Sequence, residues 1–182
     1  GLKSIGIIRG EEPSYYSPTL VDALSYGMKL IFVSREDYTL KIIPDHLEEK
    51  IEDIHTINEG GYAAAGALGA SEILKERDSA PYTHILAAAG TGTMLAGLVI
   101  PSTPSQQITG ISVFKNNYSL HEEINALLPD GKKDQFSLMH NYHFGGYARK
   151  NSQLFRFMNQ WYEQTGIPSD FIYTGKLFFA AH

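Results

Sequence analysis

The sequence of 182 residues contains no cysteine, and this absence excludes several kinds of chemistry at once. Without thiols there is no disulfide, no cysteine nucleophile and no cysteine-ligated metal site. The chain also has no apolar run of about 18 residues, the length that predicts a membrane-spanning helix. We recognise no secretory signal peptide. Together with the lack of cysteine, this predicts a protein of the reducing cytoplasm.

Positive charge and hydrolase or metal motifs are scarce as well. Fifteen lysines and arginines stand against 20 acidic residues, a net charge of -5. No basic stripe is available to neutralise phosphates, so nucleic acid is not an expected partner. His140 and His143 are three residues apart, but no H-E-x-x-H motif or suitably spaced acidic ligand accompanies them, so we predict no metal site. A G-x-S-x-G serine-hydrolase motif is also absent.

What the chain does contain is an alternation of strand-like and helix-like segments. Apolar runs predict strands at 4–8, 30–33, 84–88 and 108–114. Periodic segments with start and stop signals predict helices at 18–26, 62–77, 94–100, 121–128 and 153–164. This alternation predicts an α/β fold with mostly parallel sheets and flanking helices. The polar stretch 45–53 is our predicted lobe boundary, which divides the chain into residues 1–50 and 51–182.

The segment Ala88–Met94 is the most informative one, because it follows a predicted strand and opens a predicted helix. Glycines allow a tight turn and a close approach of backbone N–H groups to a ligand. The helix amino end favours an anion, and the hydroxyls of Thr91 and Thr93 are further donors. The segment predicts a phosphate site, although it is neither a Walker loop nor G-x-G-x-x-G. A glycine-rich turn without a ligand is the alternative.

Two tyrosine segments are less specific. Tyr173 precedes Thr174-Gly175-Lys176 and is suited to proton transfer, ring stacking or simple packing. Lys176 could form a Schiff base if it were desolvated, but an exposed lysine is the expectation. The segment 143–147 predicts a turn that carries an aromatic side chain, and Glu59-Gly60-Gly61 predicts a turn before a helix.

Five segments, taken in order, resemble the 1-aminocyclopropane-1-carboxylate deaminase / D-cysteine desulfhydrase family of pyridoxal-phosphate (PLP) enzymes. They are the strand and Arg-Gly-Glu loop at 3–12, the Asn-Glu-Gly-Gly helix start at 58–69, the glycine-threonine loop at 89–97, Tyr-His-Phe-Gly-Gly-Tyr at 142–147 and Tyr-Thr-Gly-Lys at 173–176. The resemblance implies the tryptophan-synthase-β-like fold, PLP fold type II, with a small lobe completed by residues 1–50 and a PLP-binding lobe in 51–182.

The resemblance also implies roles for individual residues. It implies that Gly90, Thr91, Gly92 and Thr93 hold the PLP phosphate, that Thr174 faces the pyridine nitrogen, and that Tyr147 and Tyr173 lie beside the substrate as catalytic or stacking residues. The expected substrate is a small amino acid, converted to an α-keto acid and ammonia by a homodimer. The deaminases resembled here carry Glu where this chain has Thr174, so threonine favours the desulfhydrase-like branch.

Two departures from the family affect the expected activity. Its Schiff-base lysine, in an S-G-N-K-type segment, would precede Gly1, and its H-[ST]-G-G segment would follow His182. No lysine of this chain matches the first of these. We therefore expect a chain that is incomplete, inactive alone and prone to association. The alternatives are a non-catalytic α/β module for a phosphorylated ligand and a nucleotide-binding domain that uses the same loop.

Overall fold

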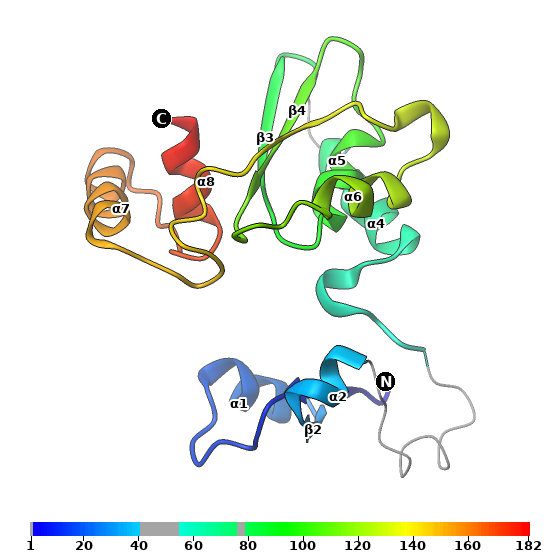
Figure 1. Ribbon diagram of the computed structural model, residues 1–182, viewed down its shortest axis with the longest axis vertical. Helices are drawn as coiled ribbons and strands as arrows, with labels where there is room; N and C mark the ends of the chain where they lie inside the picture. Colours follow the sequence, from blue (N-terminus) through cyan, green and yellow to red (C-terminus); the bar gives the residue numbers. More distant parts are fainter. Residues whose placement is uncertain (1, 41–54, 76–78) are drawn as a thin grey trace. The chain divides into compact units, whose positions relative to one another are not determined.

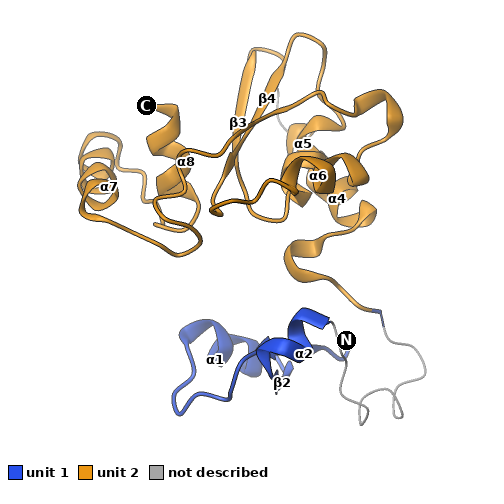
Figure 2. Cartoon of the chain, viewed as in Figure 1, with its two compact units in different colours: residues 1–55 blue, residues 56–182 orange. Residues whose placement is uncertain are grey.

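The computed structural model describes residues 2–40, 55–75 and 79–182, which belong to two compact units, residues 1–55 and 56–182 (Figure 2). The predicted boundary at 45–53 lies outside the described residues. The assignment of the two parts to a small lobe and a PLP-binding lobe stays a prediction.

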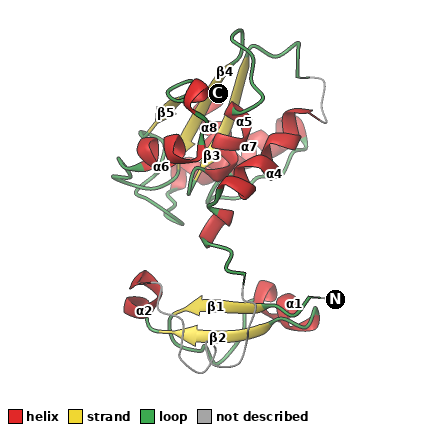
Figure 3. Ribbon diagram, turned by 90° about the vertical axis from the view of Figure 1, so that its right-hand side faces the viewer, coloured by secondary structure: helices red, strands yellow, loops and turns green. Residues whose placement is uncertain are grey.

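The first unit contains a two-stranded parallel sheet. Strand β1 (Ile5–Arg9) pairs with β2 (Lys29–Val33), and helix α1 (Pro18–Ser25) joins them (Figure 3). The fixed φ of Pro18 suits the first helical position, and Gly27 adopts a left-handed φ of 85° just after the helix. Helix α2 (Arg35–Leu40) was not predicted; the hydroxyl of Ser34 caps it by accepting the Asp37 N–H at 3.0 Å.

This first unit buries little apolar surface within its described residues. Val33, 8% exposed, is its single buried hydrophobic side chain there. Helix α1 has no buried residue, and Val21, Leu24 and Tyr26 are exposed. An isolated pair of strands is marginal in water, so these residues alone do not provide a stable core.

The second unit is built on a parallel three-stranded sheet in the order β3-β4-β5. Strands β3 (His84–Ala89) and β4 (Gln107–Ser112) pair over their full length, and β5 (Ser137–Met139) joins the far side of β4. The α/β class with mostly parallel strands is thus confirmed. Strand β5 was missed because three residues are too few to show an alternating pattern.

Helices cover both faces of this sheet (Figure 1). Helix α5 (Thr93–Val99) lies on one face, with α4 (Ala64–Lys75) and α6 (Leu120–Leu127) beside it, and α8 (Thr174–Ala181) lies on the other, next to α7 (Ser152–Thr165). Two 3₁₀ turns, η1 (Glu59–Gly61) and η2 (Asp130–Lys132), precede α4 and β5. The core lies between the α5 face and the sheet, and it is formed mainly by small and branched side chains: Ala67, Ala87, Ala89, Leu95, Ala96, Val99, Ile108, Leu120 and Ile124.

Helices α4 and α5 approach closely because their contact consists of very small residues. A methyl group placed on Gly97 would overlap the side chain of Ala70 and lie 2.7 Å from the carbonyl oxygen of Ala67. Gly69 lies on helix α4, as Ala67 and Ala70 do, but a methyl group placed on it would have no neighbouring atom within 4 Å. The close approach matters for the site because α5 begins at the glycine-threonine loop.

None of the helices among the described residues is both long and apolar enough to cross a bilayer.

We predict opposite effects for alanine at these two glycines. Gly97→Ala should lower the free energy of unfolding by about 1–3 kcal/mol, since the added methyl overpacks the α4–α5 contact. Gly69→Ala should raise it by about 0.5–1 kcal/mol through helix propensity. Urea denaturation followed by circular dichroism measures both. A Gly97→Ala protein as stable as Gly69→Ala would contradict the close contact.

Candidate active site

The loop Gly90–Thr93 joins the carboxyl end of β3 to the amino end of α5. Gly92 has a left-handed φ of 85°, and a Cβ at this position would lie 2.5 Å from the Ile124 side chain. The first intrahelical bond runs from the Ala96 N–H to the Gly92 carbonyl at 2.9 Å. The N–H groups of Thr93 and the next two residues therefore precede the helical ladder and can bind an anion.

Two threonine hydroxyls complete this loop. Thr91 Oγ1 and Thr93 Oγ1 are 3.1 Å apart, and Thr93 is only 6% exposed. One hydroxyl donates to the other, so one proton remains for a ligand. The predicted phosphate loop thus has tightly turned backbone, N–H donors and a hydroxyl proton in one place, which is a donor set that fits a phosphate group.

The glycine turn η1 packs against the two threonines of this loop. A Cβ on Gly60 would overlap the Thr91 side chain. One on Gly66, in α4, would overlap the carbonyl of Gly61 and lie 3.0 Å from Thr93 Cγ2. The sequence predicted only a turn at 59–61. Its packing against the threonines could not be read from the sequence, because 29 residues lie between Gly61 and Thr91.

The two predicted tyrosines meet at the same loop. A Cβ on Gly90 would lie 3.5 Å from the Tyr173 hydroxyl oxygen, so the phenol ring lies over this glycine. The Tyr147 ring stands edge-on to Tyr173 with ring centroids 6.0 Å apart, and it stacks on Phe114 at 5.1 Å. Phe114 was not predicted as a site residue; its position just after β4 was the available signal.

The Tyr173 hydroxyl is held in its protonated form. Partial burial raises its pKa to about 12, although 36% of the residue stays exposed, with further contributions from a side-chain hydrogen bond with Tyr147 and from the charges of Tyr147, Glu59 and Asp170. At neutral pH the phenol therefore carries its proton. In this state it can donate a hydrogen bond or a proton, and it is not poised to act as a base.

Thr174 begins helix α8 and is closely tied to Asp170. Its Oγ1 donates to Asp170 Oδ2 at 2.6 Å and accepts the Asp170 N–H at 2.8 Å. The same carboxylate accepts N–H groups from Ile172, Tyr173 and Thr174. Although burial opposes it, these bonds lower the pKa of Asp170. The Thr174 hydroxyl keeps one lone pair for a ligand but has no further proton. Asp170 was not predicted.

The sequence-based expectation for Lys176 was wrong. The side chain is fully buried rather than exposed, because α8 lies against the sheet face and turns this residue inward. Its Nζ donates to the carbonyl oxygens of Gly146, at 2.8 Å, and Val113, at 3.4 Å. Burial lowers its pKa, partly offset by the charge of Asp170.

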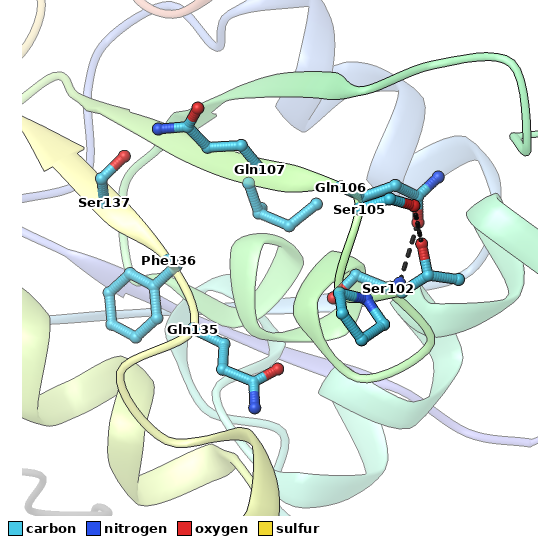
Figure 4. A pocket seen from close by; sticks show the side chains of 10 residues that line it. Ser102, Ser105, Gln106, Gln107, Gln135, Phe136 and Ser137 are labelled. Atoms are coloured by element: carbon cyan, nitrogen blue, oxygen red, sulfur yellow. Dashed lines mark hydrogen bonds between the residues drawn. The ribbon is translucent and has the colours of Figure 1, made fainter.

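A separate cavity of about 520 Å³ lies at the other end of the sheet (Figure 4). Its lining is uncharged and comes from residues 102–108 and 135–137, where β4 and β5 begin. Ligands of parallel α/β sheets bind at the carboxyl ends of strands, which favours the Gly90–Thr93 end as the functional one. Within the described ranges, no three His, Cys, Asp or Glu side chains gather as around a metal ion.

Comparisons with known proteins agree with the predicted resemblance. The chain is 25% identical, over 96% of its length, to the bifunctional D-cysteine desulfhydrase/1-aminocyclopropane-1-carboxylate deaminase of Arabidopsis thaliana, described as mitochondrial. It is 23% identical, over 98% of its length, to a putative 1-aminocyclopropane-1-carboxylate deaminase of Pyrococcus horikoshii. The crystal structure of an ACC deaminase homologue matches the whole chain with a TM-score of 0.77 at 22% identity. No protein-family model matches.

These matches confirm the resemblance and the fold. The structural match shows that the chain has the type II PLP fold. The chain spans 49% and 60% of the lengths of the two relatives and 60% of the matched structure. It therefore corresponds to about half of such a protein.

We predict that Tyr173 titrates near pH 12 and that Tyr147→Phe lowers this pKa, because the hydrogen bond and the charge of Tyr147 are removed. NMR of protein labelled at tyrosine Cζ measures it, with Tyr173→Phe to assign the signal. A raised pKa means that the folded state binds the proton more tightly. Its stabilising effect is present below pH 10 and is lost as the pH rises toward 12. Titration near pH 10 in both proteins would contradict the raised pKa and its dependence on Tyr147.

Proposed function

We propose that this chain, a relative of the D-cysteine desulfhydrase/1-aminocyclopropane-1-carboxylate deaminase proteins, is the central part of a PLP-dependent enzyme that deaminates a small amino acid. The substrate is of the D-cysteine or 1-aminocyclopropane-1-carboxylate type, and the products are an α-keto acid and ammonia, with sulfide from D-cysteine. The whole protein acts as a cytoplasmic homodimer. Residues 1–182 alone are inactive.

The observation that carries this proposal is the meeting of three distant segments at the carboxyl end of β3. The phosphate-binding donors of Gly90–Thr93, the Tyr173 phenol over Gly90 and the Tyr147 ring beside it come together there. A site of this kind has an anion cradle at one end and the protonated Tyr173 hydroxyl next to it. That is what a phosphorylated cofactor and an amino-acid substrate beside it require.

Each group has a definite part in this proposal. The N–H groups at the start of α5 and the threonine hydroxyls bind the phosphate and fix its orientation. When bound, PLP supplies the electron sink for carbanion chemistry. Tyr173 holds a proton at its hydroxyl oxygen and delivers it to the substrate. Tyr147 stacks on Phe114 and orients the Tyr173 ring through their edge-on contact.

Lysine attachment of PLP is assigned to a residue outside 1–182. Lys176 has no exposed surface, and two carbonyls hold its amine. Borohydride reduction of the full-length protein with PLP, followed by peptide mass spectrometry, locates the modified lysine. The proposal requires an adduct outside this segment together with release of ammonia from D-cysteine or 1-aminocyclopropane-1-carboxylate. Binding of phosphate or a nucleotide without any adduct would favour the non-catalytic module instead.

We predict that Thr93→Val weakens PLP binding to the full-length protein. A hydrogen bond to a charged group contributes about 1.5–3 kcal/mol, which corresponds to a loss of affinity of at least about tenfold. Absorbance titration with PLP measures the Kd. Thr103→Val is the matched control, because this hydroxyl bonds to Ser105 at the opposite end of the sheet. An equal Kd for both variants would contradict the phosphate assignment.

A further inference from the structure

Lys176 is the one charged side chain that is fully buried among the described residues. Its hydrogen-bond partners are two backbone carbonyls, and no carboxylate of the described part lies within ion-pair distance of it. Removing an ammonium group from water costs several kcal/mol. A lysine kept in such a place needs an explanation beyond the filling of space, which an apolar residue would do as well.

The two carbonyls occupy special positions in the chain. Val113 directly precedes Phe114, and Gly146 directly precedes Tyr147, while the lysine itself follows Tyr173 by three residues. The ammonium thus connects the three segments that carry the three aromatic rings of the site. These rings are the stacked Phe114–Tyr147 pair and the edge-on Tyr147–Tyr173 pair.

The segment around Gly146 requires an external restraint. Phe144 and Ala148 have positive φ angles of 51° and 53°, and Gly145 and Gly146 have φ angles of 99° and 126°. Left-handed conformations of non-glycine residues are costly and persist only where the surroundings enforce them. The Gly146 carbonyl, in the middle of this segment, accepts the short 2.8 Å bond from Lys176. Charge-assisted bonds of this kind are about twice as strong as neutral ones.

We propose that Lys176 is a positioning residue of the site: its buried ammonium holds the Gly145–Ala148 loop and the end of β4 against α8, and thereby fixes Tyr147 against Tyr173. The inference rests on the proposed function only in treating these tyrosines as site residues. Lys176 touches no reacting atom in this role. It acts as a cation tethered to α8, between the buried Val113 carbonyl and the Gly146 carbonyl, which also accepts the Arg149 N–H at 3.1 Å.

The test uses the full-length protein without PLP or substrate, so that it does not depend on the proposed activity. Lys176→Met keeps the length and apolar stem of the side chain but removes the charge. We expect the Tyr173 pKa, followed by tyrosine Cζ NMR, to fall by at least about one unit toward the ordinary value near 10, because the tyrosine pair separates. Lys132→Met is the matched control. It removes another lysine-to-carbonyl bond, to Ser102 at 2.5 Å, near the start of β4, and should leave the pKa unchanged.

Chemical rescue separates a tethered cation from a side chain that only fills space. In Lys176→Ala, propylammonium should restore the high Tyr173 pKa, whereas propanol and tetramethylammonium should not. If this variant folds only with propylammonium, recovery of both the fold and the high pKa supports the proposal. An unchanged Tyr173 pKa in Lys176→Met, or equal rescue by propanol, would overturn it. Because no readout involves PLP, a protein that fails to bind PLP can still pass this test.

Discussion

The absence of side chains at a few contacts is the constraint on which the second unit depends. Helix α5 can approach α4 because Gly97 faces Ala67 and Ala70, and the turn η1 can pack on Thr91 because position 60 is a glycine. Packed interiors leave no room for an extra methyl at such contacts. Small residues therefore set both the packing of α4 on α5 and the position of η1 against the glycine-threonine loop.

Partial or complete burial of single groups gives this region its electrostatic character. Burial raises the pKa of Tyr173 and lowers that of Lys176, so one hydroxyl stays neutral while one ammonium depends on carbonyls for its charge. Groups in such an environment have fixed partners, because a buried polar group without a hydrogen bond is costly. The two tyrosines themselves, Tyr147 and Tyr173, remain 45% and 36% exposed, so the site combines a buried ammonium with hydroxyls that a ligand can reach.

The two units differ in how far their described residues account for their stability. In the second unit, a continuous cluster joins the sheet to α4, α5 and α6. In the first, the described residues bury one hydrophobic side chain, and the outer side chains of α1 remain exposed. This contrast agrees with a chain that spans about half the length of its relatives. The expectation that the isolated chain associates stays a prediction.

The sequence by itself determined the fold class and most of the elements, since apolar periodicity and turn residues are local signals. It identified Gly90–Thr93 and both tyrosine segments as candidate site residues. It also identified Gly27 and Gly166 as the residues that follow the ends of α1 and α7. It missed β5 and α2, which are too short for a clear period, and α8, whose continuous apolar run 177–181 shows no polar face. Only the tertiary structure decided that Lys176 is buried, that η1 packs against the threonine loop and that Phe114 stacks on Tyr147. These facts depend on contacts between residues far apart in the chain, and local sequence patterns carry no information about such contacts.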